Sequence, residues 1–486
     1  MEQSVSTSKK IFWFVTPQGV PEHSRCDPGR FVRLRHYPCF IRVSVFEVEL
    51  KIALCAVLCG MTIHDDDNDL VFAKTMPWPT DRPIVVTMRE KGTKPWWEPS
   101  AAWEKRKPKP ISSHARAVIN EVIRFYSNRT CMRFKEVPYK SDKQQLTWSK
   151  QTPEIYSVDI RSSAVDSCYA SIGMMREDTY GRTSYTNPNK ISLGESCYTF
   201  STVAHEFGHV LGLFHTHTRS DRDKYIKLVK YKNIGEYRDL NWGKQNSSNL
   251  APYDFGSVMH YLAADDSEGS VERLITTNDP LRQFIIGTRT GPSQSDLLQL
   301  NLLYKCFDRC GSAKVHCLNG GFQNPNNCFA CVCPRGFASR LCETREETTF
   351  NGRPCGATLI AKDEWLTVKG SPISQRSPHG RKDPSSTLMC HWHLKTSLGY
   401  KLEISLKKLG KCSTSLTCQD GGIEIKLGDF GMGGYKFCCN QHLPRNHVFR
   451  TLGSLAHINQ DVWKGEQWFE LQFRRVAQQN SSPSAL

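Results

Sequence analysis

The stretch that decides the fold is HEFGHVLGLFH at residues 205–215. On an α-helix, His205 and His209 stand four residues apart, so their side chains lie on one face about one turn from each other. Gly212 permits a positive φ, so the helix can end there and the chain can turn sharply. The turn can then bring His215 back beside the first two imidazoles. The spacing therefore predicts three histidine nitrogens around one point.

Three neutral imidazoles around one ion leave a fourth tetrahedral position open for water, as in a catalytic rather than a structural zinc site. Glu206 follows His205 at about 100° around the helix, so it can act as a general base on that water instead of binding the metal. We therefore expect one Zn²⁺ in the catalytic domain. A bare HExxH pattern also occurs by chance in unrelated helices, and the glycine and the third histidine make this form far more specific.

A second informative segment is SVMHY at residues 257–261. Taken alone, Met259 is more often an ordinary core residue. The extended histidine pattern, however, is that of the metzincin peptidases, and the segment resembles the Met-turn that lies beneath their metal. Tyr261 matches a tyrosine of the astacin family, in which it can bind zinc and swing to support the oxyanion. Together the two segments predict a metzincin active site.

Other segments also resemble the astacin family. They are RSDRD at 219–223, TCMRF at 130–134, SCYASIG at 167–173, CY at 197–198 and YKC at 304–306. The resemblance implies disulfides Cys131–Cys306 and Cys168–Cys197. It also implies an edge strand that pairs with an extended peptide, and hence an endopeptidase. Glu206 is then expected to move the proton from the attacking water to the leaving amine, while zinc and Tyr261 stabilise the oxyanion.

Three features depart from the family pattern. Thr216 stands where the family usually has a glutamate that contacts the mature N-terminus. The prosegment motif whose aspartate caps the zinc is not found, and the acidic run from Asp65 to Asp69 is better explained as a solvated surface. Residues 89–113 look like an insertion that fits neither the helix nor the strand period, so we expect an exposed loop there.

The chain has 20 cysteines in 486 residues, which indicates disulfides and an oxidising compartment. They fall into four groups, and each group has an even number of cysteines, which suits disulfide pairing within each unit. The tight group from Cys310 to Cys342 spans too few residues to bury an adequate core, so crosslinks must supply much of its stability. It resembles an EGF module. The final group lies among strands that alternate apolar and polar residues, which predicts a β-sandwich, and this unit resembles a CUB domain.

These two resemblances imply further pairings. They are Cys310–Cys328, Cys317–Cys331 and Cys333–Cys342 in the EGF module, and Cys355–Cys390 in the CUB domain. The pairing of Cys412, Cys418, Cys438 and Cys439 stays open. The expected fold is therefore an α+β multidomain protein. Its parts are a leader and prosegment at 1–75, with a candidate signal core at 52–60, a peptidase domain at 76–308, the EGF module at 310–342, the CUB domain at 355–476 and a disordered tail at 477–486.

Composition narrows the class of protein. No apolar run reaches the ~18 residues that a membrane-spanning helix needs, and no nucleic-acid module is recognisable. The net charge of +16 favours binding to acidic surfaces such as matrix polysaccharides. The alternative is a basic protein without a dedicated polyanion site. Sequons at Asn128, Asn246 and Asn480 agree with a secreted glycoprotein.

The sequence thus predicts a secreted, zymogen-derived zinc endopeptidase of extracellular proteins. The order of its domains is similar to that of nematode astacins, which implies roles in cuticle or collagen processing, moulting or hatching. The alternative is a catalytically silent binding protein that acts through its EGF and CUB units. A matrixin-like protease is a further alternative, because a small hydroxyl residue follows the third histidine, but the segment 257–261 and the cysteine layout disfavour it.

Overall fold

The computed structural model describes residues 12–13, 43–44, 62–66, 69–73, 75–88, 110–138, 157–163, 167–175, 189–229, 242–265, 272–288, 290–375, 387–411 and 416–478. The chain divides into two compact units, Met1–Lys74 and Thr75–Leu486. In the first unit, β1 (Phe12–Trp13) pairs with β2 (Val43–Ser44), and β3 (Thr62–Asp66) pairs with β4 (Asp69–Ala73). The predicted signal core at 52–60 lies outside the described residues, and so does the part 89–109 of the candidate insertion at 89–113.

The described residues of the second unit include a five-stranded sheet. The strands of this sheet lie in the order β7-β6-β8-β11-β9. Its strands are β6 (Ile84–Met88), β7 (Phe134–Pro138), β8 (Ser157–Ser162), β9 (Cys168–Ala170) and β11 (Lys190–Leu193). Three pairings are parallel, and β9 alone pairs antiparallel, with β11. Short strands β5 (Thr75–Met76) and β10 (Met174–Met175) also pair.

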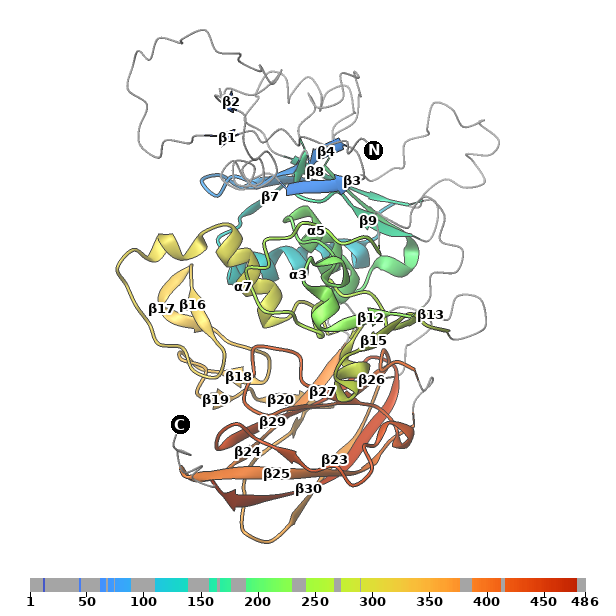
Figure 1. The fold of residues 1–486 in the computed structure, drawn as a ribbon, viewed down its shortest axis with the longest axis vertical. Helices are drawn as coiled ribbons and strands as arrows, with labels where there is room; N and C mark the ends of the chain where they lie inside the picture. Colours follow the sequence, from blue (N-terminus) through green and yellow to red (C-terminus); the bar gives the residue numbers. More distant parts are fainter. Residues whose placement is uncertain are drawn as a thin grey trace, which may run out of the picture. The chain divides into compact units, whose positions relative to one another are not determined.

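Two helices, α3 (Ser113–Arg129) and α5 (Phe200–Val210), lie on one side of this sheet (Figure 1). The side chain of Ser112 caps α3, so the helix begins inside the segment 89–113 that the sequence predicts as loop. The apolar residues of α3 recur at helical spacing and face the core, where Val118 and Val122 are fully buried. The hydroxyl of Tyr126 donates to the carbonyl oxygen of Ala204 at 2.8 Å, which ties α3 to α5.

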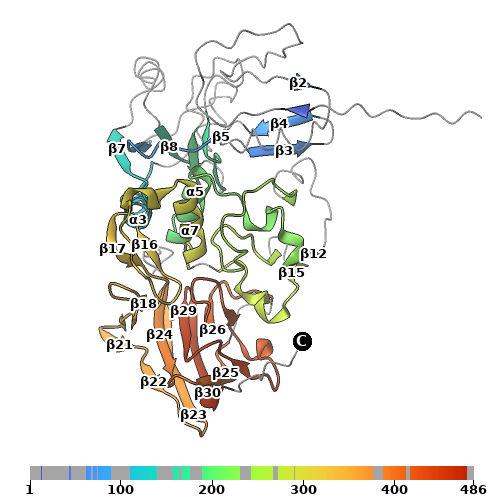
Figure 2. The same ribbon diagram turned by 60° about the vertical axis from the view of Figure 1, so that its left-hand side comes forward.

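Irregular chain and short elements complete residues 76–308, which the sequence predicts as a peptidase domain and which we call the peptidase region (Figures 1 and 2). They are η2 (Glu195–Cys197), η3 (Thr216–Thr218), η4 (Arg222–Lys224), η5 (Pro280–Ile285), η6 (Cys306–Cys310), β12 (Ile226–Leu228) paired with β15 (Ile275–Thr277), and β13 (Ala264–Asp265) paired with β14 (Glu272–Arg273). Helix α7 (Gln294–Leu303) opens with a capping box, in which the side chains of Ser293 and Asp296 each accept a hydrogen bond from the other's backbone N–H. Disulfides Cys131–Cys306 and Cys168–Cys197 are present.

A small crosslinked region follows. It holds β16 (Phe322–Asn324), β17 (Asn327–Val332), β18 (Phe337–Ala338) and β19 (Thr344–Arg345). Its disulfides are Cys310–Cys328, Cys317–Cys331 and Cys333–Cys342. The chain runs on through β20 (Thr348–Phe350), which pairs with β21 (Arg353–Cys355). We call residues 310–345 the crosslinked region.

The rest of the chain is a sandwich of two sheets (Figures 1 and 2). One sheet contains β22 (Thr358–Ile360), β24 (Leu388–Lys395), β29 (Leu455–Val462), β26 (Gly421–Lys426) and β27 (Tyr435–Phe437); the other contains β23 (Leu366–Gln375), β30 (Gly465–Ala477), β25 (Tyr400–Leu409) and β28 (Phe449–Arg450). The short helix η7 (Asn440–His442) joins them. Alternate residues such as Leu402, Ile404, Leu471 and Phe473 are buried between the sheets, as the period-two pattern predicts.

The sandwich contains the disulfides Cys355–Cys390 and Cys418–Cys438. The second pair answers part of what the sequence leaves open; Cys439 is also disulfide-bonded, and Cys412 lies outside the described residues. The predicted disordered tail lies outside them from residue 479, while β30 extends to Ala477. Within the described part of the chain, no helix is long and apolar enough to span a membrane.

Candidate active site

Helix α5 places two of the three predicted metal ligands. Thr199 caps its start through a hydrogen bond from the backbone N–H of Thr202, and the helix ends at Val210. Gly212 has a φ of +93°, so the chain turns there and returns with His215. The rings of His205 and His209 have centroids 4.7 Å apart, and that of His215 lies 4.5 Å from His209. One nitrogen from each of the three lies within 4.8 Å of the others.

Backbone carbonyls orient two of these rings. The Nδ1–H of His205 donates to the carbonyl oxygen of Val258 at 2.7 Å, and the Nδ1–H of His209 donates to that of Leu213 at 2.8 Å. Each ring therefore presents an unprotonated Nε2 to the centre. Burial, with a smaller contribution from the His205 charge, lowers the pKa of His209 to about 3. Burial also lowers the pKa of His205 and of His215, so all three are neutral at pH 7.

The donor set fits a zinc ion. The Nε2 atoms of His209 and His215 are 3.0 Å apart, with a lone pair of His209 directed at its neighbour. Two nitrogens bound tetrahedrally to one zinc at about 2.0–2.1 Å lie about 3.3 Å apart, which is close to this separation. Neutral imidazole nitrogens that converge this closely suit a cation bound between them. Nitrogen ligands with an open fourth position favour catalytic zinc.

Glu206 lies beside this centre and is only 4% exposed. Its Oε2 atom is buried and has no hydrogen-bond partner among the described residues. Burial raises the pKa of this carboxyl to about 8. This carboxyl oxygen without a partner therefore lies next to three convergent imidazoles, in the position of a general base for a metal-bound water.

Met259 lies beneath the histidines and is fully buried. Its backbone carbonyl accepts a hydrogen bond from the N–H of Thr216 at 3.0 Å, which joins this turn to the residue after His215. A Cβ built on Gly208 would lie 2.6 Å from the Sδ atom of Met259. Gly208 thus leaves the space that the methionine fills under helix α5. Sequence reasoning missed this role, although the glycine stands inside the quoted motif.

Tyr261 lies against the third histidine. Its ring centroid is 4.1 Å from that of His215 and 4.3 Å from that of His217, on which it stacks at 30°. The N–H of Tyr261 donates to Nδ1 of His217 at 3.4 Å, and the ring of Trp242 packs on both aromatic side chains. Burial, and then the charge of Glu206, raises the pKa of Tyr261 to about 12, so its phenol keeps its proton. Sequence reasoning named neither His217 nor Trp242.

Thr216, the departure noted in the sequence, takes part in a buried hydrogen-bond chain. Its hydroxyl donates to the Oγ of Ser257 at 2.8 Å, and Ser257 donates to Oδ1 of Asp296 at 2.6 Å. The second oxygen of Asp296 accepts from the N–H of Val258 at 3.0 Å and from that of Ser293 at 2.9 Å. The turn that carries Met259 is therefore fastened to the start of α7.

Other candidate residues are placed as follows. Asn128 and Asn246 are exposed, and Asn480 lies outside the described residues. Cys418, Cys438 and His442 form a second cluster of metal-ligating types, but the two sulfurs are bonded to each other and are not thiolates. The triad of histidines is thus the stronger metal site among the described residues.

The chain is similar to known zinc peptidases. Residues 90–305 match the model of the Astacin peptidase family. Zinc metalloproteinase nas-25 of Caenorhabditis elegans is 34% identical over 64% of this chain and 71% of its own length. Zinc metalloproteinase nas-27 of the same organism is 29% identical over 75% of this chain and 81% of its own length.

Among solved structures, high choriolytic enzyme 1, a hatching enzyme zinc-protease from the medaka fish Oryzias latipes, is 23% identical, with a TM-score of 0.34 over 48% of this chain and 94% of that one. The family match and the two nematode relatives disfavour both the matrixin-like and the catalytically silent alternatives. The chain belongs to the astacin family of zinc metalloendopeptidases.

Proposed function

We propose that this zinc endopeptidase works outside the cell and cuts internal peptide bonds of extracellular proteins. We assign His205, His209 and His215 as its zinc ligands, Glu206 as its general base and Tyr261 as a donor to the oxyanion. The observation that carries the assignment is the convergence of three neutral imidazoles beside a buried carboxylate that lacks a partner among the described residues.

Zinc, when bound, polarises the scissile carbonyl and lowers the pKa of water toward ~7. Glu206 accepts the proton that the attacking water loses and then delivers it to the nitrogen of the leaving amine. Its burial, which already favours the protonated carboxyl, makes this proton uptake less unfavourable. The neutral phenol of Tyr261 donates a hydrogen bond to the oxygen that becomes negative as the carbonyl is attacked.

The substrate is expected to bind as an extended strand along β9. This strand lies at the edge of the sheet, and Cys168 at its start is tethered to Cys197 just before α5. Tyr169 in the middle of β9 is 46% exposed. An exposed antiparallel edge can pair with the main chain of a peptide that continues on both sides, which supports cleavage inside a protein rather than at its ends.

The remaining regions support an extracellular setting. Disulfides throughout the described part of Thr75–Leu486 suit an oxidising compartment. We assign 76–308 as the peptidase domain, 310–342 as an EGF module and 355–476 as a CUB domain, with 1–75 as leader and prosegment. We infer N-glycosylation at the exposed Asn128 and Asn246, and matrix or cuticle proteins, including collagens, as substrates.

The test uses the full chain secreted from eukaryotic cells, with its terminus sequenced to identify the processed form. Processed protein is incubated with gelatin, and the new termini are identified by mass spectrometry. We expect internal cuts that stop in 1,10-phenanthroline and resume when zinc is restored. Zinc-loaded, processed protein that leaves gelatin and other extracellular matrix proteins uncut would refute the proposal and favour a binding role for the EGF and CUB units.

A further inference from the structure

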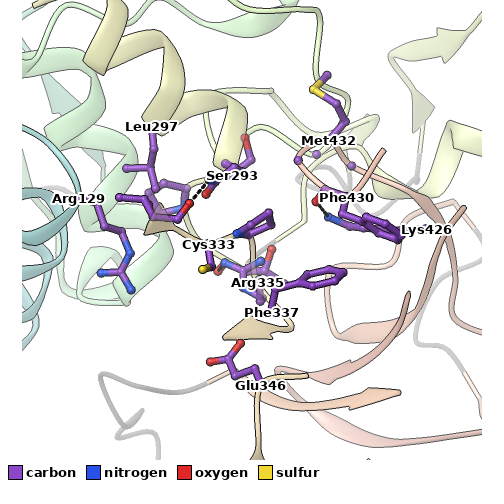
Figure 3. Close-up of a pocket in the computed structure, with 18 of the residues that line it drawn as sticks. Arg129, Ser293, Leu297, Cys333, Arg335, Phe337, Glu346, Lys426, Phe430 and Met432 are labelled. Carbon is purple, nitrogen blue, oxygen red and sulfur yellow. Dashed lines mark hydrogen bonds between the residues drawn. The ribbon is translucent and has the colours of Figure 1, made fainter. Parts of the chain in front are cut away.

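A cavity of about 440 Å³ lies where the peptidase region, the crosslinked region and the sandwich meet (Figure 3). Its walls include Arg129 and Leu297 from the peptidase region, Arg335 and Phe337 from the crosslinked region, and Phe430 from the sandwich. The volume is in the range of small-molecule sites. Nothing in the astacin reaction described above uses this cavity.

Hydrogen bonds between the three regions hold its walls in place. The side-chain amide of Asn326 donates to the carbonyl oxygen of Thr130 at 3.0 Å, directly after α3. The side chain of Gln294 donates to the carbonyl oxygen of Val332 at 2.7 Å. The N–H of Gly433 donates to Oδ1 of Asp254 at 2.8 Å. This bond fixes the sandwich loop, which joins β26 to β27, to the peptidase region. The cavity is therefore a built feature of the folded unit.

Two guanidinium groups face this space with most of their donors unused. Arg129 lies over the ring of Phe125 at 4.2 Å, and among the described residues its guanidinium makes no hydrogen bond or ion pair, although the charge of Glu346 acts on it from further away. Arg335 makes one described hydrogen bond, to the carbonyl oxygen of Thr290 at 2.5 Å. Each guanidinium carries five N–H donors in a planar fork that suits an oxyanion.

The two carboxylates that line the cavity, those of Glu346 and Glu424, each accept a hydrogen bond from a backbone N–H. Oε2 of Glu346 accepts from the N–H of Gly336 at 2.8 Å. Oε1 of Glu424 accepts from the N–H of Gly434 at 2.7 Å and lies 3.6 Å from Nζ of Lys426. Figure 3 shows Arg129, Arg335 and Glu346 around the same space.

The two guanidinium charges also repel each other. Burial first, and then the charge of Arg335, lowers the pKa of Arg129, while Glu346 opposes that change. Burial also lowers the pKa of Arg335, and the charges of Glu424, Asp461 and Glu346 oppose that change. Glu424 lies 3.6 Å from Nζ of Lys426, and Asp461 lies 2.8 Å from Nζ of Lys436, so each of these two carboxylates also faces a lysine. An anion that binds both guanidiniums would offset the positive charge that remains.

We propose that this junction cavity binds a tetrahedral oxyanion, which Arg129 and Arg335 hold together. The anion is free sulfate or phosphate, or the sulfate ester of an extracellular polysaccharide. The apolar side chains of Leu297, Phe337 and Phe430 leave room for a sugar ring beside the charged group. The site is separate from the peptide-cleaving centre, so the proposal does not depend on the peptidase assignment.

The test measures thermal unfolding of the full chain at constant ionic strength, with sodium chloride replaced stepwise by sodium sulfate, sodium phosphate or a sulfated heparin disaccharide. Only the folded chain has the cavity, so a bound anion raises Tm along a saturable curve. A plateau with sulfate or phosphate alone identifies a free anion, and a plateau at lower concentration with the disaccharide identifies a sulfate ester. No saturable rise with any of them overturns the proposal.

Variants localise the effect. Arg129→Gln and Arg335→Gln should each raise the half-saturating anion concentration at least tenfold, whereas Arg353→Gln, the same charge change at an exposed residue outside the cavity, should leave it unchanged. Arg129→Lys keeps the positive charge but loses the planar fork of donors, so its half-saturating anion concentration should be intermediate. This variant still tests the site where a glutamine variant folds poorly. Equal half-saturation in all four variants and the unaltered chain overturns the assignment.

Discussion

Gly208→Ala tests the packing beneath the zinc-binding helix. At an ordinary helix position, replacing glycine by alanine stabilises by about 1 kcal/mol. Here the new Cβ would lie 2.6 Å from Sδ and 3.4 Å from Cε of Met259, in a fully buried contact. Overpacking of this kind costs about 1–3 kcal/mol. We therefore expect the variant to be about 1 kcal/mol less stable than the unaltered chain, whereas the same replacement at an ordinary helix position increases stability.

The measurement is the Tm of the zinc-loaded full chain. A loss of about 1 kcal/mol in a region of this size lowers Tm by about 2–4 °C. Gly453→Ala is the matched control, because a Cβ there would meet no atom within 4 Å, and its Tm should barely change.

A double variant supplies a sharper result. Met259→Ala alone opens a cavity and costs about 2–5 kcal/mol. In Gly208→Ala combined with Met259→Ala, the added methyl group enters the vacated space, so the two losses should fall short of additivity by about 1–3 kcal/mol. A rise in Tm for Gly208→Ala, together with additive losses in the double variant, would show that Met259 does not pack under Gly208.

Two further perturbations follow from the same contacts. Tyr261→Phe removes the phenol that donates to the oxyanion, so kcat for a peptide substrate should fall about 10²–10³-fold with KM nearly constant; a rise in KM at constant kcat would assign Tyr261 to ground-state binding instead. Gly433→Ala introduces a Cβ 2.8 Å from the backbone nitrogen of Gly256 and 2.9 Å from Oδ1 of Asp254, so Tm should fall while Gly453→Ala leaves it unchanged; equal Tm values would mean that the sandwich loop does not dock on the segment before Met259.

Local patterns were sufficient for much of the fold. The period of α3 and α7, the capping box at Ser293 and the alternation in β25 and β30 depend on residues close in sequence, so the sequence indicates them. The placement of His205 and His209 on one helical face is of the same kind. In these features, the backbone geometry and the neighbouring residues leave few alternative local structures.

Features that depend on distant partners were not readable. The role of Gly208 needs Met259 beneath it, and the hydrogen bonds of Thr216 need Ser257 and Asp296 from later segments. The pairing of Cys418 with Cys438 could not be read from spacing, because four cysteines allow three connectivities. Period and composition do not report which segments meet across a core.

The most direct test combines zinc content with turnover in the unaltered chain and in Glu206→Gln. Elemental analysis of processed protein should find one zinc per chain in both, because the three imidazoles, not the carboxylate, hold the ion. Peptide hydrolysis by Glu206→Gln should fall about 10²–10⁴-fold. An unaltered chain without stoichiometric zinc, or a Glu206→Gln variant with undiminished hydrolysis, would contradict the account.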